Sequence, residues 1–178
     1  MNEQNFSLQP FETSKLSNLN ITGNIARNNN KLTIYYAMKG DLASVVIPAP
    51  VDLPKRKYDL WEETCFEFFV GIKNYPHYWE FNLSPAGDWN VFRLEDYRQG
   101  LQEELAVTSL PFSVQQKSDA LLLTLEVDLN QFISGEESLE IGITTVIKSE
   151  DGDISYWALT HCGDEADFHR RDSFIVEL

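Results

Sequence analysis

The chain has 178 residues, of which 43% are hydrophobic, and this length supports one hydrophobic core better than two. We therefore expect a single domain over residues 1–178, with residues 1–15 as a candidate extended arm. Its 28 acidic side chains outnumber 14 basic ones, and the formal net charge of -14 repels phosphate backbones and anionic lipid headgroups. The composition thus argues against nucleic acids and membrane surfaces as partners.

The N-terminal sequence has no basic start followed by an apolar run, so we find no secretory signal and expect a cytoplasmic protein. Charged or polar residues interrupt every hydrophobic segment, so no stretch approaches the roughly 18 apolar residues of a membrane-spanning helix. Cys65 and Cys162 are far apart in the sequence, and we expect both thiols to be free in a reducing compartment.

The first predicted elements form a hairpin. Residues 31–38 alternate between apolar and polar side chains, which is typical of a half-buried strand. Asn28-Asn29-Asn30 precede them and favour a turn, so residues 19–27 are expected to be the partner strand.

Residues 60–71 predict a third strand, with Phe66 and Val70 on one face and Trp61 and Glu67 on the other. An unpaired charge within so apolar a strand is costly. Glu67 is therefore expected to have a hydrogen-bonding or charged partner. Two interpretations stay open, a structural carboxylate bound by backbone amides or an arginine, and a contact with a ligand.

Residues 78–94 predict a hairpin around the turn at Pro85 and Gly87. If the loop holds two or four residues, even-numbered residues of the first strand share a face with odd-numbered residues of the second. One polar face then carries Tyr78, Glu80, Asn82, Trp89 and Arg93.

The rest of the chain predicts mostly strands. Residues 96–105 favour a short helix, and alternation then predicts strands over 120–128, 139–147 and 154–159, with a closing edge strand at 174–178. Because alternating segments dominate, we predict an all-β fold, an antiparallel β-sandwich with no long helix.

The predicted polar face has the chemistry of a sugar-binding surface. The flat apolar side of a pyranose stacks on an indole ring, and its hydroxyl groups need fixed donors and acceptors. A neutral carbohydrate or a similar small polar ligand is therefore the expected partner of this face.

Four blocks of the sequence resemble bacterial DOMON-like domains that are similar to family 9 carbohydrate-binding modules. The blocks are L-W-E-E-T-C-F-E-F-F-V-G, Y-W-E-F-N-L-S-P-A-G-D-W-N-V-F, D-Y-R-Q-G and F-H-R-R-D-S-F-I-V-E-L, and the resemblance covers residues 16–178. Trp61, Glu67 and Asn82 stand at the matching positions of the first two blocks.

The resemblance implies an antiparallel β-sandwich of jelly-roll type that binds a saccharide between two tryptophan rings. It makes Trp61 and Glu67 the first site candidates and Trp157 a candidate second ring. It also implies a structural calcium ion, which is frequent in the family, while the residues themselves indicate no other cofactor.

The sequence does not predict an enzyme, and we assign no catalytic residue. It has three histidines and neither a Gly-x-Ser-x-Gly nor a His-Glu-x-x-His motif. Glycoside hydrolysis by Glu67 and Glu80 stays open as an alternative. A metal site also stays open, so the metal content is not predicted; its candidate ligands are His161, Cys162, Asp164, Asp167 and His169.

Two further alternatives concern binding. Some DOMON domains bind haem, for which Met38 would be the candidate ligand, although its apolar strand face favours packing in the core. The aromatic face could instead recognise another protein. The sequence does not predict the oligomeric state.

Overall fold

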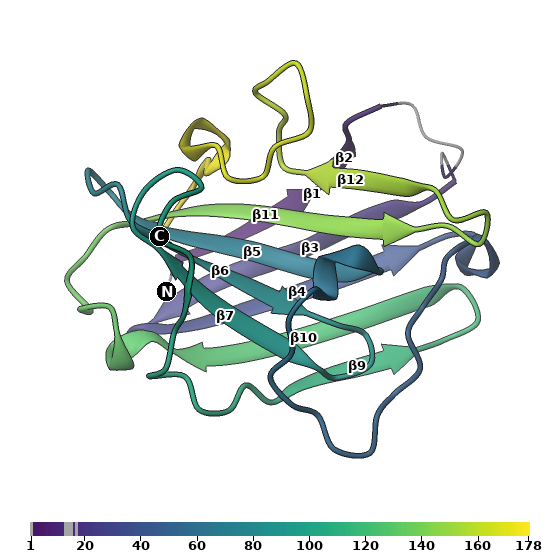
Figure 1. The fold of residues 1–178 in the computed structure, drawn as a ribbon, viewed down its shortest axis with the longest axis horizontal. Helices are drawn as coiled ribbons and strands as arrows, with labels where there is room; N and C mark the ends of the chain where they lie inside the picture. The colour runs from purple at the N-terminus through teal and green to yellow at the C-terminus, as the bar shows by residue number, and fades with distance from the viewer. Residues whose placement is uncertain (1, 13–15, 17) are drawn as a thin grey trace.

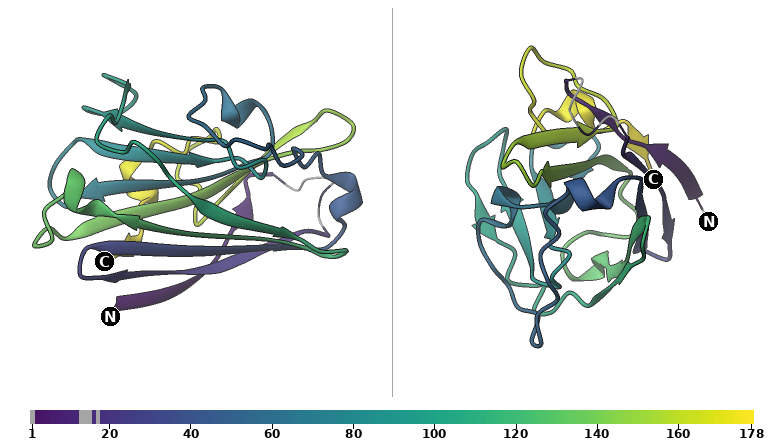
Figure 2. Two further views of the ribbon diagram at one scale, coloured as in Figure 1. Left: turned by 90° about the horizontal axis from the view of Figure 1, so that it is seen from below. Right: turned by 90° about the vertical axis from the view of Figure 1, so that its right-hand side faces the viewer.

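The computed structural model describes residues 2–12, 16 and 18–178. The strands of these residues form two antiparallel sheets (Figure 1). Seen edge-on in Figure 2, the sheets lie in two layers. The predicted antiparallel β-sandwich is therefore confirmed.

The smaller sheet has five strands in the order β1-β3-β4-β10-β9. Its strands are β1 (Asn2–Ser7), β3 (Asn20–Asn28), β4 (Lys31–Lys39), β9 (Phe112–Gln116) and β10 (Ala120–Asp128). The predicted opening hairpin is present as β3 and β4. Asn29 and Asn30 join these strands with φ angles of 48° and 60°, a left-handed conformation that asparagine tolerates and that tight hairpin turns require.

The larger sheet runs in the order β2-β12-β11-β5-β6-β7-β8, with β13 also paired to β11. Its strands are β2 (Gln9–Pro10), β5 (Cys65–Ile72), β6 (Tyr78–Leu83), β7 (Trp89–Leu94), β8 (Gln102–Glu103), β11 (Leu139–Lys148), β12 (Ile154–Ala158) and β13 (Val176–Glu177). In Figure 1 the long central strands β11, β5, β6 and β7 lie side by side.

The helices are single 3₁₀ turns, namely η1 (Leu42–Ser44), η2 (Leu60–Glu62), η3 (Leu129–Gln131) and η4 (Arg171–Ser173). None in the described part of the chain is long and apolar enough to cross a membrane. The predicted helix over 96–105 is wrong, because left-handed φ angles of 51° at Arg98 and 68° at Gly100 turn this segment back so that its residues Gln102–Glu103 pair with β7 as β8. The predicted strand over 60–71 is shorter, since η2 occupies its first residues.

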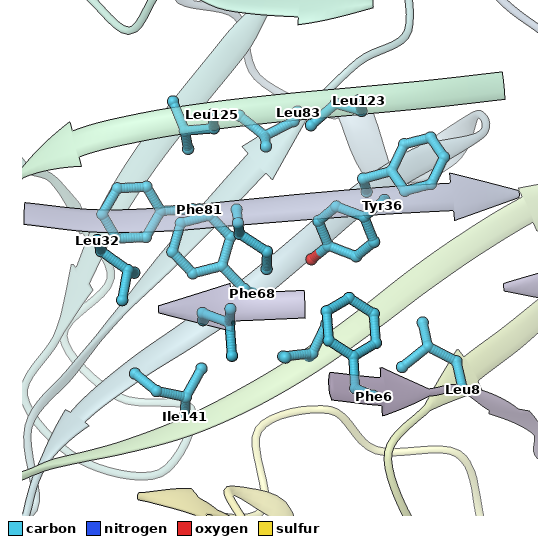
Figure 3. Close-up of a cluster of buried hydrophobic side chains, with 14 of the residues drawn as sticks. Phe6, Leu8, Leu32, Tyr36, Phe68, Phe81, Leu83, Leu123, Leu125 and Ile141 are labelled. Carbon is cyan, nitrogen blue, oxygen red and sulfur yellow. The ribbon is translucent and has the colours of Figure 1, made fainter. Parts of the chain in front are cut away.

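The hydrophobic core lies between the two sheets (Figure 3). In it the rings of Phe68 and Phe81 stack with centroids 4.3 Å apart. The Tyr36 hydroxyl of β4 donates a hydrogen bond of 2.7 Å to the backbone carbonyl of Glu67 on β5. Because Phe66 and Phe68 face this core, the side chain of Glu67 between them faces the opposite side of the larger sheet.

The first strands of the chain belong to both sheets. β1 pairs with β3 of the smaller sheet, and β2 pairs with β12 of the larger one. Phe6 and Leu8 of this segment are packed in the core. Residues 2–7 and 9–10 of the expected extended arm are therefore paired strands, whereas residues 1 and 13–15 of that prediction lie outside the described residues.

Candidate functional site

A cavity of about 450 Å³ lies on the outer face of the larger sheet, on the side turned away from the core. This volume falls within the roughly 300–1,000 Å³ that is usual for small-molecule sites. The cavity is lined by Trp61, Glu67, Glu80, Leu94, Arg98, Leu101, Val146, Tyr156, Ala166, Phe168 and His169. The sheet forms its floor, and segments before β8 and after β12 form its walls.

Two buried carboxyl groups lie in the floor of this cavity. Glu67 of β5 exposes 3% of its surface and Glu80 of β6 exposes 6%. Burial and the nearby charge of Glu80 raise the pKa of Glu67 well above its usual range. Burial also raises the pKa of Glu80 to about 7, against smaller opposing effects of Asn82 and Arg98. Because two adjacent buried carboxylates repel one another, the pair holds a proton at neutral pH.

Several buried polar atoms of the floor lack a hydrogen bond. These are Oε1 of Glu67, both amide atoms of Asn82 and Oγ1 of Thr144. Asn82 faces Glu67 across the β5–β6 pair, and Thr144 faces it across the β5–β11 pair. The Asn82 amide lies close enough to Glu80 to lower its pKa, but it reaches no hydrogen-bond geometry. The side chains of Cys65 and Thr144 lie close enough to Glu67 to lower its pKa, which meets the prediction of a partner only in part, because Oε1 is left without a hydrogen bond. Buried polar atoms of this kind cost about 1–3 kcal/mol each when they stay unpaired.

His169 covers Glu80 from above the sheet. Its Nδ1 atom is 2.8 Å from the hydroxyl of Tyr78, and its Nε2 atom is 3.7 Å from Oε2 of Glu80. The Tyr78 oxygen accepts the backbone N–H of Arg98, so its own proton is directed to Nδ1 and the Nε2–H points to Glu80. Burial and the charge of Arg98 lower the pKa of His169 to about 4, which leaves the imidazole neutral at pH 7.

The walls of the cavity are joined by an ion pair. Arg98 of the segment before β8 lies 2.8 Å from Asp167 of the segment after β12. The Tyr97 hydroxyl also donates a hydrogen bond to Asp167, and Asp167 accepts the backbone N–H of His169. The charge of Arg98 is therefore balanced by Asp167 within the wall.

Aromatic rings surround the opening of the cavity. The Trp61 indole of η2 is 36% exposed and packs edge-on against Phe92, with centroids 6.0 Å apart. Tyr156 of β12 is 42% exposed, and its ring lies 5.8 Å from that of Phe168. These rings offer flat apolar surfaces beside the buried polar floor.

Trp89 and Arg93 lie on the other face of the sheet, so their predicted place beside Glu80 is wrong. The strands β6 and β7 are joined by the five residues 84–88, and Leu83 therefore pairs with Trp89 and Trp79 with Arg93. An odd loop length puts odd-numbered residues of both strands on one face. Trp89 is packed in the core.

Trp157 is also misplaced by the prediction. It is buried in the core, and its Nε1 atom donates a 3.0 Å hydrogen bond to Ser155. Its neighbour Tyr156 faces the cavity instead, because adjacent residues of β12 point to opposite faces. The alternation of side chains along this strand is the feature of the sequence from which Tyr156 could have been identified as a cavity residue.

The remaining predicted residues lie at or under the cavity. Trp61, Glu67 and Glu80 line it, whereas Tyr78 and Asn82 are fully buried and support the lining residues. Sequence reasoning missed Leu94, Arg98, Leu101, Val146, Tyr156, Ala166, Phe168 and His169.

The alternative metal and haem sites find no support in the side-chain geometry. Among the described residues no group of three or more His, Cys, Asp or Glu side chains could hold a metal ion, which also leaves the calcium ion implied by the resemblance without such a ligand set. His161 contacts the carbonyl oxygen of Gln9 at 2.8 Å. Met38 is packed in the core.

No protein-family model matches the sequence, and no curated protein matches it significantly. Solved structures do share its fold. A protein of Bacteroides uniformis assigned to carbohydrate binding aligns with a TM-score of 0.69 and 16% identity, over 96% of this chain and 84% of that chain.

A family 9 carbohydrate-binding module from Caldicellulosiruptor kristjanssonii in complex with glucose aligns with a TM-score of 0.55 and 9% identity, over 94% of this chain and 78% of that chain. The complex of such a module from the same organism with cellotriose gives a TM-score of 0.52 and 8% identity, over 89% and 73% of the two chains. The chain therefore has a β-sandwich fold like that of family 9 carbohydrate-binding modules.

Proposed function

We propose that the protein is a non-catalytic binding module that holds a saccharide in the cavity on the larger sheet. The observation that carries the proposal is the polar floor of the cavity, formed by the carboxyl groups of Glu67 and Glu80 with Oε1 of Glu67 unpaired, beneath an aromatic opening. A sugar hydroxyl both donates and accepts hydrogen bonds, so it suits a pair of carboxyl groups that shares a proton.

The exposed indole of Trp61 supports the same function. A pyranose has an apolar face that packs on a flat ring, and Trp61 presents such a ring at the edge of the cavity. Tyr156 presents a second ring on the cavity wall. In this arrangement the rings contact the sugar face and the floor binds its hydroxyl groups.

The fold also supports the proposed saccharide binding, since two of the structures with a similar fold hold glucose or cellotriose. Identities of 8–9% carry no residue-level correspondence, so the proposal rests on the side chains of this chain.

The non-catalytic part of the proposal follows from the floor itself. Hydrolysis by two carboxyl groups needs one that donates a proton and one that is ionised, placed on either side of the scissile bond. Glu67 and Glu80 lie together in one floor, on the same face of adjacent strands. They can therefore bind hydroxyl groups from one side of a ligand.

Isothermal titration calorimetry with glucose and cellotriose tests the proposal. We expect millimolar or tighter binding by the parent protein and weaker binding by Trp61→Ala. Tyr75→Ala is the matched control, because Tyr75 is an exposed aromatic residue that does not line the cavity. Absence of binding to both sugars and to a wider glycan array would overturn carbohydrate binding. Release of glucose from cellotriose would overturn the non-catalytic assignment.

A further inference from the structure

Among the described residues that line the cavity, the acidic groups have no matching cation. Glu67 and Glu80 lie in its floor, and Arg98 is the basic side chain in its wall, already paired with Asp167 at 2.8 Å. The other titratable side chains that interact with the two carboxyl groups are Cys65, Tyr36 and Tyr78 of the strands and His169 of the wall. None of these four supplies a positive charge at neutral pH, since the imidazole is held neutral by burial.

Glu67 is the group that most needs a partner. Its side chain lines the cavity, it is more than nine-tenths buried, and its Oε1 atom has no hydrogen bond. A buried carboxylate becomes favourable when a cation bonds to it, because the attraction is strong in a region of low dielectric constant. The unpaired oxygen therefore favours a ligand that brings a positive charge.

The aromatic rings of the cavity wall also favour a positively charged ligand. Trp61, Tyr156 and Phe168 line the cavity around the two carboxyl groups. The negative face of an aromatic ring attracts an ammonium group, and tryptophan does so best. A hydroxyl group gains little from this effect.

We propose that the preferred ligand is an amino sugar, whose protonated amine bonds to Glu67 while its pyranose ring packs against Trp61. An ammonium group donates three hydrogen bonds and carries the charge that the floor lacks. The hydroxyl group of a neutral sugar donates one and leaves the carboxyl pair uncompensated. This inference rests on the proposed function, because the ring contact requires a saccharide in the same cavity.

Calorimetric titration at neutral pH with glucosamine, glucose and N-acetylglucosamine tests the inference. The three sugars share a ring, but only glucosamine carries a positive charge. A charge-assisted hydrogen bond is about twice as strong as a neutral one, so we expect glucosamine to bind about tenfold tighter than the other two. Glucose binding as tightly as glucosamine would overturn the inference and leave carbohydrate binding intact.

Two variants test whether the carboxyl groups of the cavity floor cause the preference for glucosamine. Glu67→Gln keeps the shape of the side chain and removes its charge, and we expect it to reduce the preference for glucosamine to less than about threefold. Glu80→Gln should reduce it as well, which gives a second test if one variant folds poorly. Glu126→Gln is the control of equal net charge, since Glu126 is exposed and pairs with Lys31 on the smaller sheet. A preference unchanged in both cavity variants would overturn the assignment to Glu67.

Ethanolamine carries an ammonium group but no sugar ring, so it tests whether the charge alone is sufficient for binding. We expect it to bind much more weakly than glucosamine, because it lacks the face that packs on Trp61. Equal binding would overturn the amino-sugar inference. If none of the three sugars binds while another saccharide of the glycan array does, the amino-sugar inference fails and the proposed function stands; if no saccharide of the array binds, the proposed function itself fails.

Discussion

The Nε2 atom of His169 lies 3.7 Å from Oε2 of Glu80, and the two side chains respond to pH in opposite directions. Burial raises the pKa of Glu80 to about 7 and lowers that of His169 to about 4, so both groups stay neutral near pH 6. Each therefore changes the stability of the protein when pH moves away from that value.

Replacing Glu80 by Gln should stabilise the protein in alkaline buffer. The folded pKa of about 7 exceeds the usual 4.5, so the stability contributed by the neutral carboxyl group is full below pH 4.5 and is lost as pH rises to about 7. Near pH 8 we expect Glu80→Gln to be more stable than the parent by on the order of 3 kcal/mol, and near pH 4 about equal. Urea unfolding at both pH values measures the difference, with Glu126→Gln as the exposed control. Equal stability of parent and variant at the higher pH would contradict this.

His169 should make the folded protein less stable as the pH falls into the acid range. Its folded pKa of about 4 lies below the usual 6.5, so its contribution to stability is full above pH 6.5 and is lost as pH falls through about 4. His169→Gln cannot gain that charge, and its stability should therefore decline less between these two values. His161→Gln is the matched control, because His161 lies outside the cavity. The same acid-side decline in parent and His169→Gln would show that this histidine does not cause it.

Two tryptophans should give opposite results when replaced by alanine. Trp61 lines the cavity and is partly exposed, so Trp61→Ala should weaken saccharide binding by about threefold to tenfold and change the melting temperature little. Trp79 is packed in the core, and Trp79→Ala should reduce stability by about 3–5 kcal/mol. Calorimetric binding and thermal unfolding of both variants test this pair. A large loss of stability in Trp61→Ala would show that the ring is structural.

Adjacent residues of β12 offer a second contrast. Tyr156→Ala should weaken binding with little loss of stability, because its ring faces the cavity. Trp157→Ala should cost about 3–5 kcal/mol of stability, because its ring is packed in the core. Thermal unfolding ranks the two variants, and a melting temperature that falls equally in both would be inconsistent with the two faces of this strand.

The strands were predictable where one face is buried. Alternation alone predicted residues 120–128 as a strand, and β10 has the same bounds, with Leu121 and Leu125 fully buried. The same alternation placed Glu67 opposite the core. Period-two patterning is reliable here because each sheet has one face in the hydrophobic layer.

The register of β6 and β7 was not predictable, since it depends on whether the loop length is odd or even. Gly87, with φ of 104°, lies in a five-residue connection closed by a 2.9 Å hydrogen bond from Ser84 to the Asp88 carbonyl. One residue more or fewer would have placed Trp89 on the outer face of the larger sheet.

The walls of the cavity were beyond sequence reasoning for a different reason. Arg98 and His169 come from irregular segments distant in the sequence, which meet through the Arg98–Asp167 ion pair. No periodicity governs such segments.

The N-terminal strands β1 and β2 connect the two sheets along one side of the sandwich. β1 adds an edge to the smaller sheet and β2 adds one to the larger, although only Leu8 separates them in the sequence. A cut that removed residues 2–10 would bare the hydrogen-bonding edges of both β3 and β12. Bare edges pair readily with other chains. Residues 2–10 therefore cover one edge of each sheet, and we expect a variant that lacks them to aggregate more readily than the parent protein.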